Sequence, residues 1–577
     1  MSALSEQLTL LKTRAMPNAN GKNINLMQES MQIAIAQLNP RIGDFEGNLA
    51  QMLAAVAQAK LLHADILCFG ELSVCGYPPR DFLEFADFIA ECDAAVAQLA
   101  AQTADSAIAL VVGAPTRNPQ IAGKDLFNSA HFLAHGRILQ TVHKTLLPTY
   151  DIFDEYRYFE PNTTFETVTF GGKKIAITIC EDIWNVGNEN PLYPVCPLDE
   201  LQSQQPDFIL NLSASPFSYD HAAVRIHTLR ANVARYGIPI FYVNHSGAST
   251  EIIFDGGSLV VSPDGCVYDE LPYFATDLRT YDLAAVTQGG ISREQPKEKI
   301  ALIHDALVYG IRNYFGKLGF QSALLGVSGG IDSAVVAALA VRALGANNVR
   351  GVAMPSQYSS GHSVTDAQEL AHNLGIQLDI IPIKAGYDAM IEVLTPFFEG
   401  KPFNVAEENM QARIRMIQLM ALSNKLGGVV LNTSNKSEAA VGYGTLYGDM
   451  AGGLAVLGDV YKTTVFELAQ YLNKDQIVIP LNTISKPPSA ELRPNQKDSD
   501  SLPDYDILDR ILFEYIEARQ GPREIIAKGY DETLVRRVLR MVNINEFKRF
   551  QTPPILRISN KAFGMGRRMP LEGKYLG

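Results

Sequence analysis

The stretch Leu324-Leu-Gly-Val-Ser-Gly-Gly-Ile-Asp-Ser333 decides the fold of the C-terminal half of the chain. An apolar run at 322–327 has the length of a buried strand, and the run at 334–340 behind the loop is rich in helix formers. Because Gly329 and Gly330 have no Cβ atoms, the loop backbone can approach a ligand closely. The N–H groups at a helix start favour negative charge. A strand, a glycine loop and a helix in this order therefore predict an anion site.

This loop differs from the kinase-type phosphate loop, Gly-x4-Gly-Lys-Ser/Thr, because it contains no Lys. Asp332 takes that place, and such a carboxylate can hold Mg2+ against phosphates. The pattern Ser-Gly-Gly-x-Asp-Ser at 328–333 resembles the pyrophosphate loop of the ATP pyrophosphatases. That resemblance implies attack on the α-phosphate of ATP, transfer of AMP and release of pyrophosphate. A glycine-rich turn without a ligand is the alternative.

The size and composition of the chain are those of a globular enzyme with two or more domains. It has 577 residues, of which 47% are hydrophobic and 19% charged. The net charge of −13 argues against a general nucleic-acid binder. Six cysteines without metal-ligand spacing indicate a reducing compartment. Since no run reaches the length of a membrane span and residues 1–30 lack a signal-peptide core, we expect a cytoplasmic protein without nucleic-acid or membrane partners.

The pattern of strands and helices divides the chain into four parts. Residues 1–30 are polar and weakly patterned, which is typical of a mobile extension. Residues 31–285 alternate strands with turns and helices, a Gly- and Pro-containing linker is predicted at 286–298, and a second α/β domain follows at 299–577. Repeating β/α units in this second domain predict a doubly wound parallel sheet, with a nucleotide site at its C-terminal edge.

Three functional side chains lie at or just beyond predicted strand ends in the first domain, where open α/β sheets place their sites. Cys180 can attack an amide carbon to form a thioester. Glu71 can take the thiol proton. Lys144 can stabilise the developing oxyanion and favour the thiolate. Taken one at a time, these residues have plain structural alternatives: a buried cysteine, a surface or capping acid and a solvated lysine.

The sequences around these three residues resemble the nitrilase superfamily. The matching stretches are Gly-Glu-Leu-x3-Gly-Tyr at 70–77, His-Lys-x2-Leu-Pro at 143–148 and Cys-Glu-Asp-Ile-Trp at 180–184. The resemblance covers about 31–285. It implies an αββα sandwich in which Glu71, Lys144 and Cys180 form the catalytic triad.

A second chemical constellation, Asn435-Lys-Ser-Glu438, follows a predicted strand at 427–433. Glu438 could complete a Mg2+ site with Asp332, and Lys436 could face a phosphate. Asn and Ser also suit a turn that caps the next helix, so the tetrapeptide alone leaves both interpretations open.

The second half resembles the NAD+ synthetases over seven stretches: 328–333, 408–415, 435–438, 445–452, 459–463, 487–492 and 498–503. With the nitrilase-like half in front, residues 31–577 resemble the glutamine-dependent form of this family. The pairing of the two halves is more specific than either half alone, and it implies an adenine nucleotide α-hydrolase-like fold for the second domain.

This resemblance implies an enzyme with two sites. In one, Cys180 releases ammonia from glutamine; in the other, the nicotinate carboxylate of deamido-NAD+ attacks ATP, and ammonia displaces AMP to give NAD+. The cofactor implied is Mg2+, with ATP as co-substrate, and the family implies an ammonia tunnel and a homo-oligomer. The matching residues are Tyr150, Ser215 and His221 (usually Lys) for glutamine; Gly326, Val327, Ser328, Gly329, Gly330, Ile331, Asp332, Ser333 and Thr433 for ATP; Asn409, Glu438 and Lys548 for deamido-NAD+; and Asp332 and Glu438 for Mg2+.

Three other functions are alternatives to this one. A pyrophosphate-loop amidotransferase acting on another carboxylate is disfavoured by Asn409 and the stretch 433–438. A metabolite-binding regulator with degenerate sites, or an amidase with an inert appendage, is disfavoured by the intact loop at 328–333. The basic stretch Lys561–Arg568 is either a flexible phosphate-binding tail or a solvated terminus.

Overall fold

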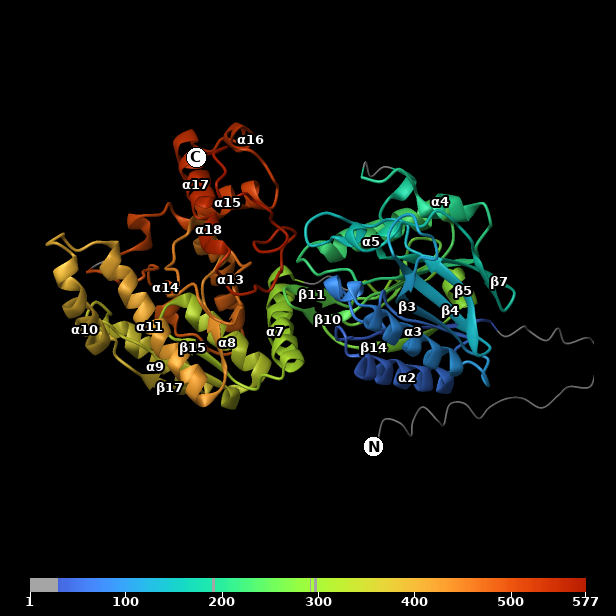
Figure 1. Cartoon of the computed structure of the whole chain (residues 1–577), viewed down its shortest axis with the longest axis horizontal. Coiled ribbons are helices and arrows are strands. Elements are labelled where there is room, and N and C mark those ends of the chain that lie inside the picture. Colours follow the sequence, from blue (N-terminus) through green and yellow to red (C-terminus); the bar gives the residue numbers. More distant parts are fainter. Residues whose placement is uncertain (1–29, 189–191, 291, 295–297, 495, 577) are drawn as a thin grey trace, which may run out of the picture.

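The computed structural model describes residues 30–188, 192–290, 292–294, 298–494 and 496–576. The predicted extension at 1–30 lies outside these ranges except for its last residue, and the predicted linker is described only in part. Figure 1 shows two α/β bodies, with α7 (Lys299–Leu318) standing between them.

The N-terminal body contains two six-stranded sheets. In sheet order, the first consists of β14 (Asp277–Asp282), β1 (Gln32–Gln37), β2 (Ile66–Cys68), β3 (Ala109–Arg117), β4 (Leu126–Ala134) and β5 (Arg137–His143). The second consists of β13 (Val267–Glu270), β12 (Leu259–Val261), β9 (Ile240–Val243), β8 (Phe208–Leu212), β7 (Lys173–Ile179) and β6 (Val168–Phe170).

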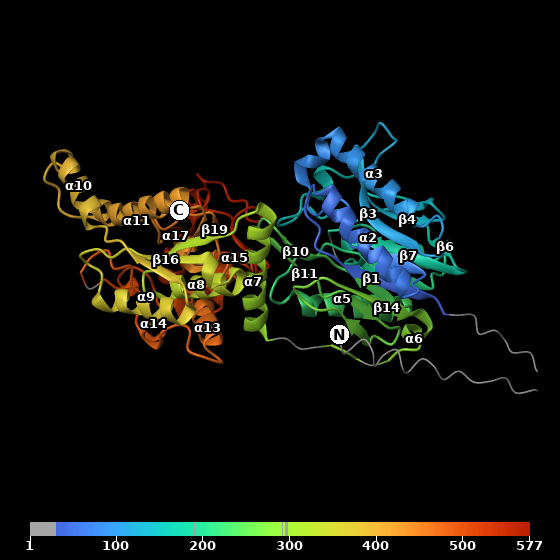
Figure 2. The ribbon, with the colours of Figure 1, turned by 90° about the horizontal axis from the view of Figure 1, so that it is seen from below.

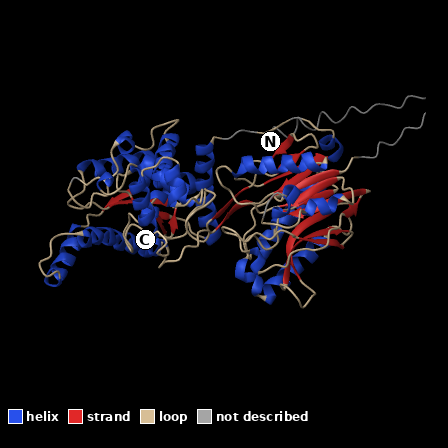
Figure 3. Ribbon diagram, turned by 90° about the horizontal axis from the view of Figure 1, so that it is seen from above, coloured by secondary structure: helices blue, strands red, loops and turns tan. Residues whose placement is uncertain are grey.

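Alternation of side chains along the strands explains why these sheets pack in layers. Ile33 and Ile35 of β1 join a core with strands of the second sheet, whereas Ala34 and Ala36 pack toward helices on the outer face. The helices outside the first sheet are α2 (Phe45–Leu61) and α3 (Ala86–Ala101), and those outside the second are α4 (Pro197–Gln202) and α5 (His221–Tyr236). The predicted αββα sandwich is confirmed, and Figure 3 shows its strands in red between blue helices.

A two-stranded hairpin, β10 (Ser246–Ser249) and β11 (Ile252–Asp255), connects this sandwich to α7. Ala248 and Ile253 share a core with α7, and the hydroxyl oxygens of Ser246 and Tyr309 lie 2.8 Å apart. This hairpin was not predicted from the sequence, because β10 is made of small and polar residues. The helix α6 (Leu283–Thr287) crosses the predicted domain boundary at residue 285.

The C-terminal body contains a five-stranded sheet in which every neighbouring pair is parallel. Its order is β17 (Gln377–Ile380), β16 (Val349–Ala353), β15 (Ala323–Gly326), β18 (Val429–Asn432) and β19 (Leu454–Ala455). The chain order reverses at β15, so the loops after β15 and β18 meet at the position where doubly wound folds bind ligands.

Helices cover both faces of this sheet, which confirms the doubly wound prediction. One face packs against α7, α8 (Ile331–Leu344), α9 (Gly361–Leu374) and α13 (Lys462–Leu472). The other packs against α10 (Lys384–Leu394) and α11 (Val405–Leu426), which extend away from the sandwich in Figure 2. The remaining helices are α12 (Lys436–Val441), α14 (Leu481–Ser485), α15 (Tyr505–Ile516), α16 (Pro522–Ala527), α17 (Glu532–Ile544) and α18 (Glu546–Arg549). None of the helices within the described ranges combines the length and the apolar content that a membrane span requires.

The segment after α18 returns to the middle of the molecule. Ile555 pairs with Ala455, Lys561 reaches Asp151 of the sandwich at 3.1 Å, and the buried Arg567 contacts Glu546 at 2.6 Å. Both predictions for Lys561–Arg568, a flexible tail and a solvated terminus, are therefore wrong.

Candidate functional site

Cys180 lies directly after β7, in a turn with an unusual backbone conformation. Its φ is +45°, a value that non-glycine residues rarely adopt and that is often found at functional sites. The carboxylate of Asp182 holds the turn in place by accepting hydrogen bonds from the N–H groups of Ile179 (3.0 Å), Thr145 (3.0 Å) and Leu146 (2.8 Å). The same carboxylate thus fixes the cysteine turn and the segment that carries Lys144.

Glu71 and Lys144 form a fully buried ion pair. The Nζ of Lys144 lies 2.7 Å from Oε1 of Glu71. The amide of Asn128 donates to the same oxygen at 2.7 Å, and the N–H of Ala214 donates to Oε2 at 3.2 Å. These donors fix the orientation of the carboxylate that is predicted to act as the base.

Glu155 is a fourth member of this group that the sequence analysis did not assign. Its Oε1 accepts hydrogen bonds from Lys144 Nζ at 2.9 Å and from the hydroxyl of Tyr77 at 2.7 Å. Burial raises the pKa of Glu155 to about 7. It opens a single turn of 3-10 helix, Glu155–Arg157, so neither a strand end nor a repeating pattern marks it in the sequence.

The charges around Cys180 suit a nucleophile that is deprotonated during attack. Burial and the nearby Glu71 carboxylate raise the pKa of the thiol well above its ordinary value, although Lys144 opposes this. Burial would lower the pKa of Lys144, but the carboxylates of Glu155 and Glu71 raise it well above the ordinary value. The resting group therefore combines a thiol with an ammonium, and Glu71 is the available base.

The three predicted glutamine contacts surround the cysteine turn. The Tyr150 hydroxyl donates to Oε1 of Glu181 at 2.9 Å. The Ser215 hydroxyl lies 2.8 Å from Nε2 of His221, whose ring stacks on Trp184. Burial lowers the pKa of His221 to about 4, so this imidazole is neutral where a Lys of the family would be charged.

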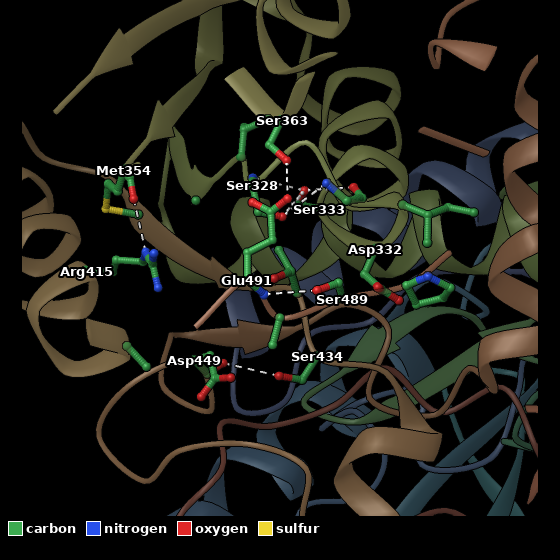
Figure 4. A pocket seen from close by; sticks show the side chains of 18 of the residues that line it. Ser328, Asp332, Ser333, Met354, Ser363, Arg415, Ser434, Asp449, Ser489 and Glu491 are labelled. Atoms are coloured by element: carbon green, nitrogen blue, oxygen red, sulfur yellow. Dashed lines mark hydrogen bonds between the residues drawn. The ribbon is translucent and has the colours of Figure 1, made fainter. Parts of the chain in front are cut away.

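The loop after β15 forms the second site, shown in Figure 4. Gly329 has a φ of +78°, and a Cβ atom there would lie 2.8 Å from the Cα of Ser363 in α9. The Ser328 hydroxyl accepts from the N–H of Gly330 at 3.2 Å. No side chain caps α8, so its first N–H groups face the loop, as expected of an anion site.

This loop opens on a cavity of about 300 Å³. Arg415, which received no role in the sequence analysis, brings a cation into it and donates to the carbonyl of Met354 at 3.0 Å. Glu491 also lines the cavity and accepts from the Ser363 hydroxyl at 2.8 Å. The predicted residues that line it are Gly326, Val327, Ser328, Gly330, Ile331, Asp332, Ser333, Thr433 and Glu438.

Asp332 and Glu438 lie on either side of a third residue, Lys462, which the sequence analysis missed. Its Nζ lies 2.5 Å from Asp332 and 3.5 Å from Glu438. Burial and the charge of Asp332 raise the pKa of Glu438 to about 8. The ammonium of Lys462 lies between the two carboxylates, whose oxygens are the ligand type that Mg2+ takes. Within the described ranges no three His, Cys, Asp or Glu side chains gather as a metal site, so such an ion would need further ligands.

Four predicted residues are not part of the cavity lining: Gly329, Asn409, Lys548 and Lys436. Asn409 accepts from the Thr445 hydroxyl at 2.7 Å, and Lys548 donates to the carbonyls of Gly442 and Gly444. The prediction that Lys436 faces a phosphate is wrong. Its ammonium is fully buried between two carboxylates, Asp459 and Glu517, each at 2.8 Å.

Comparison with known proteins agrees with this two-site arrangement. The family model described as carbon-nitrogen hydrolase matches residues 32–289, and the one described as NAD synthase matches 303–552. A glutamine-dependent NAD(+) synthetase from Synechocystis sp. is 45% identical, over 93% of this chain and 98% of the relative. The chain belongs to the glutamine-dependent NAD(+) synthetases.

Other members of the glutamine-dependent NAD(+) synthetases match over the same length. The synthetase from Thermotoga maritima is 39% identical, over 94% of this chain and 99% of its own. The solved structure of the synthetase from Acinetobacter baumannii, in complex with ADP, is 38% identical and superimposes with a TM-score of 0.75. It covers 94% of this chain and 98% of its own, so the resemblance extends through both bodies.

Proposed function

We propose that the protein makes NAD+ by amidating deamido-NAD+, with glutamine as the nitrogen donor and ATP cleaved to AMP and pyrophosphate. The observation that carries the proposal is the presence, in one chain, of the buried group Glu71, Lys144 and Cys180 and of the loop Ser328–Ser333 beside its cavity. An amidase needs only the first site, and a ligase that uses free ammonia needs only the second.

In the first site, Cys180 Sγ attacks the side-chain amide carbon of glutamine while Glu71 takes the thiol proton. Lys144 and backbone N–H groups after Cys180 stabilise the oxyanion. The proton passes to the leaving nitrogen, ammonia departs, and water then resolves the thioester to glutamate. Tyr150, Ser215 and His221 are proposed to hold the substrate; the neutral His221 would contribute a hydrogen bond instead of a charge.

In the second site, the loop N–H groups and the start of α8 bind the phosphates of ATP. The nicotinate carboxylate attacks the α-phosphate, pyrophosphate leaves, and ammonia displaces AMP from the resulting mixed anhydride. Asp332 and Glu438 would hold Mg2+, which supplies charge neutralisation at the phosphates. Arg415 brings positive charge into the same cavity. Asn409, Glu438 and Lys548 are proposed to contact deamido-NAD+, and Thr433 to contact ATP.

Further proposals rest on the sequence and on the family. The domains are proposed to span 31–285 and 299–577, with a linker at 286–298. The enzyme is proposed to be cytoplasmic, because its six cysteines are free, as is usual in a reducing compartment. A homo-oligomer and an ammonia tunnel between the sites are also proposed.

The deciding experiment measures NAD+ formation from deamido-NAD+, ATP and Mg2+, with glutamine or ammonium chloride as nitrogen source. Cys180→Ala should lose the glutamine reaction and keep the ammonium reaction. Cys266→Ala is the matched control, because Cys266 is a free, partly exposed cysteine of the same body. If the unmodified protein makes no NAD+ from either nitrogen source, the substrate is a different carboxylate.

A further inference from the structure

The cavity beside the loop Ser328–Ser333 has few positive charges. Among the described residues that line it, the cations are Arg415, Lys462 and Lys486, and the acids of the lining outnumber them. Lys462 is already paired with Asp332 at 2.5 Å, and Figure 4 shows Arg415 apart from the loop. The loop itself contains no lysine, the residue that reaches the outer phosphates in the kinase-type loop. A side-chain cation for those phosphates would therefore have to come from another segment.

Lys486 is brought to the cavity by a short helix on one side and two prolines on the other. The helix α14 ends at Lys486, whose N–H donates to the carbonyl of Asn482 at 3.0 Å. Pro487 and Pro488 follow and also line the cavity. A residue before proline is restricted to an extended backbone, and Lys486 has a ψ of 145°. The backbone that directs this side chain is therefore fixed on both sides.

A buried carboxylate holds the ammonium of Lys486. Its Nζ lies 2.9 Å from Oδ2 of Asp366, whose side chain is only 6% exposed. The side-chain amide of Asn482 donates to both oxygens of that carboxylate, at 3.1 and 2.8 Å, and so fixes its orientation. Among the described residues Asp366 is the one hydrogen-bond partner of this ammonium, which leaves two of its three donors for a ligand.

The position of Asp366 on α9 places this ammonium on the loop's side of the cavity. Asp366 and Ser363 are three residues apart on α9, so their side chains share one face of the helix. At Ser363 the helix backbone touches the loop, because a Cβ atom on Gly329 would lie 2.8 Å from the Cα of Ser363. Side chains of a helix lean toward its N-terminus, so Asp366 and the ammonium bound to it lean toward the loop.

We propose that Lys486 is a further catalytic residue, the cation that binds the outer phosphates of ATP and stabilises pyrophosphate as it leaves. This inference rests on the proposed function. When the nicotinate carboxylate oxygen bonds to the α-phosphorus, the bond from that phosphorus to the bridging oxygen breaks, and its electron pair stays on the departing pyrophosphate. Lys486 donates hydrogen bonds to this growing charge and transfers no proton. Because Asp366 holds the ammonium in place beforehand, no reorganisation is needed during the reaction.

The test removes the charge of Lys486 and keeps a long polar side chain. Lys486→Gln does this, and Lys486→Arg retains a charge at the same position. The double variant Lys486→Gln/Asp366→Asn leaves no buried carboxylate unpaired, so it carries the same test if the single variant fails to fold. Lys528→Gln is the matched control, because Lys528 forms an ion pair with Glu514 at 2.7 Å and is not part of the cavity lining.

Binding of inorganic pyrophosphate and of AMP, each with Mg2+, is measured by calorimetry. Lys486→Gln and the double variant should bind pyrophosphate about tenfold or more weakly, the size of one hydrogen bond to a charged group, and AMP within about twofold of the unmodified protein. Lys486→Arg should recover part of the pyrophosphate affinity. With ammonium chloride as nitrogen source, Lys486→Gln should lower kcat for NAD+ formation about 100-fold. Lys528→Gln should change none of these quantities.

Two results would overturn this role of Lys486. One is an unchanged pyrophosphate affinity in Lys486→Gln or, if that variant does not fold, in the double variant. The other is an equal weakening of pyrophosphate and AMP, which would mean that Lys486 only supports α14 and Asp366. An unmodified protein that binds pyrophosphate through Lys486 but makes no NAD+ from ammonium would instead reject the proposed function, so the two failures are distinguishable.

Discussion

Replacing Gly329 by alanine tests whether the loop after β15 binds ATP, and the expected effect can be worked out from its geometry. The φ of +78° costs a residue with a Cβ atom about 1–2 kcal/mol. The new Cβ would also lie 2.8 Å from Cα of Ser363 and collide with its carbonyl oxygen. Both atoms are backbone in α9, so the loop itself must shift, by about 1 Å. A misplacement of that size lowers the rate by about 100-fold, equivalent to about 2.7 kcal/mol of transition-state stabilisation.

The assay is steady-state NAD+ formation with glutamine and with ammonium chloride, alongside glutamine hydrolysis measured as glutamate. Gly329→Ala should lower kcat/KM for ATP about 100-fold with either nitrogen source, while glutamine hydrolysis without ATP is unchanged. Gly319→Ala is the control: its φ is +77°, but no atom lies within 4 Å of a new Cβ. It should lower Tm by a few degrees and leave kcat/KM within about twofold. A Gly329→Ala enzyme with more than about a third of the ATP-dependent activity, or a Gly319→Ala enzyme with the same loss, would refute the reasoning.

Three other predictions follow from buried charges. Glu155→Gln should lower the glutamine-dependent kcat/KM by about 100-fold, because Lys144 loses one of its two carboxylate partners, and steady-state kinetics should show the ammonium reaction unchanged. Asp255→Asn leaves the buried Arg225 without its bidentate partner, so urea titration should show a loss of about 3 kcal/mol in the free energy of unfolding. A loss below about 1 kcal/mol, the range of an exposed ion pair, would contradict this. Burial lowers the pKa of Lys317 to about 8, so between pH 8 and 10.5 the unfolded chain binds more protons and stability rises with pH. Lys317→Met should remove that contribution, which urea titrations at the two ends of the window would reveal.

The sequence predicted the residues whose position follows from topology. Cys180 directly follows a strand, and Ser328 and Thr433 follow two others, as the carboxyl ends of parallel strands require. Glu155 could not be predicted in this way, because it reaches Lys144 from a single turn of 3-10 helix and not from the end of a strand. Lys462 was missed for a related reason. It opens α13, and only the packing of that helix against α8 brings its ammonium to Asp332.

The hairpin β10–β11 shows the same limit for the fold. One of its two short strands, β10, carries small and polar residues, and the packing of the hairpin depends on α7, which comes later in the chain. A local pattern cannot report a partner supplied by another domain. The prediction for Lys436 was wrong for the same reason, because distant residues, Glu517 and Asp459, determine where its ammonium lies.

Three buried lysines share one arrangement, each between two carboxylates: Lys144 with Glu71 and Glu155, Lys462 with Asp332 and Glu438, and Lys436 with Asp459 and Glu517. Burial alone would neutralise a lysine, and two acids more than offset that tendency at Lys144 and Lys462. The three groups differ in what else each lysine lies against. Lys144 lies near a thiol and Lys462 borders the cavity, whereas Lys436 donates its other hydrogen bonds to Ser559 and to the carbonyl of Lys561. Residue type and spacing reveal none of this: the same lysine-and-two-acids group is proposed to stabilise an oxyanion at Lys144, borders the cavity at Lys462 and is part of the buried structure at Lys436.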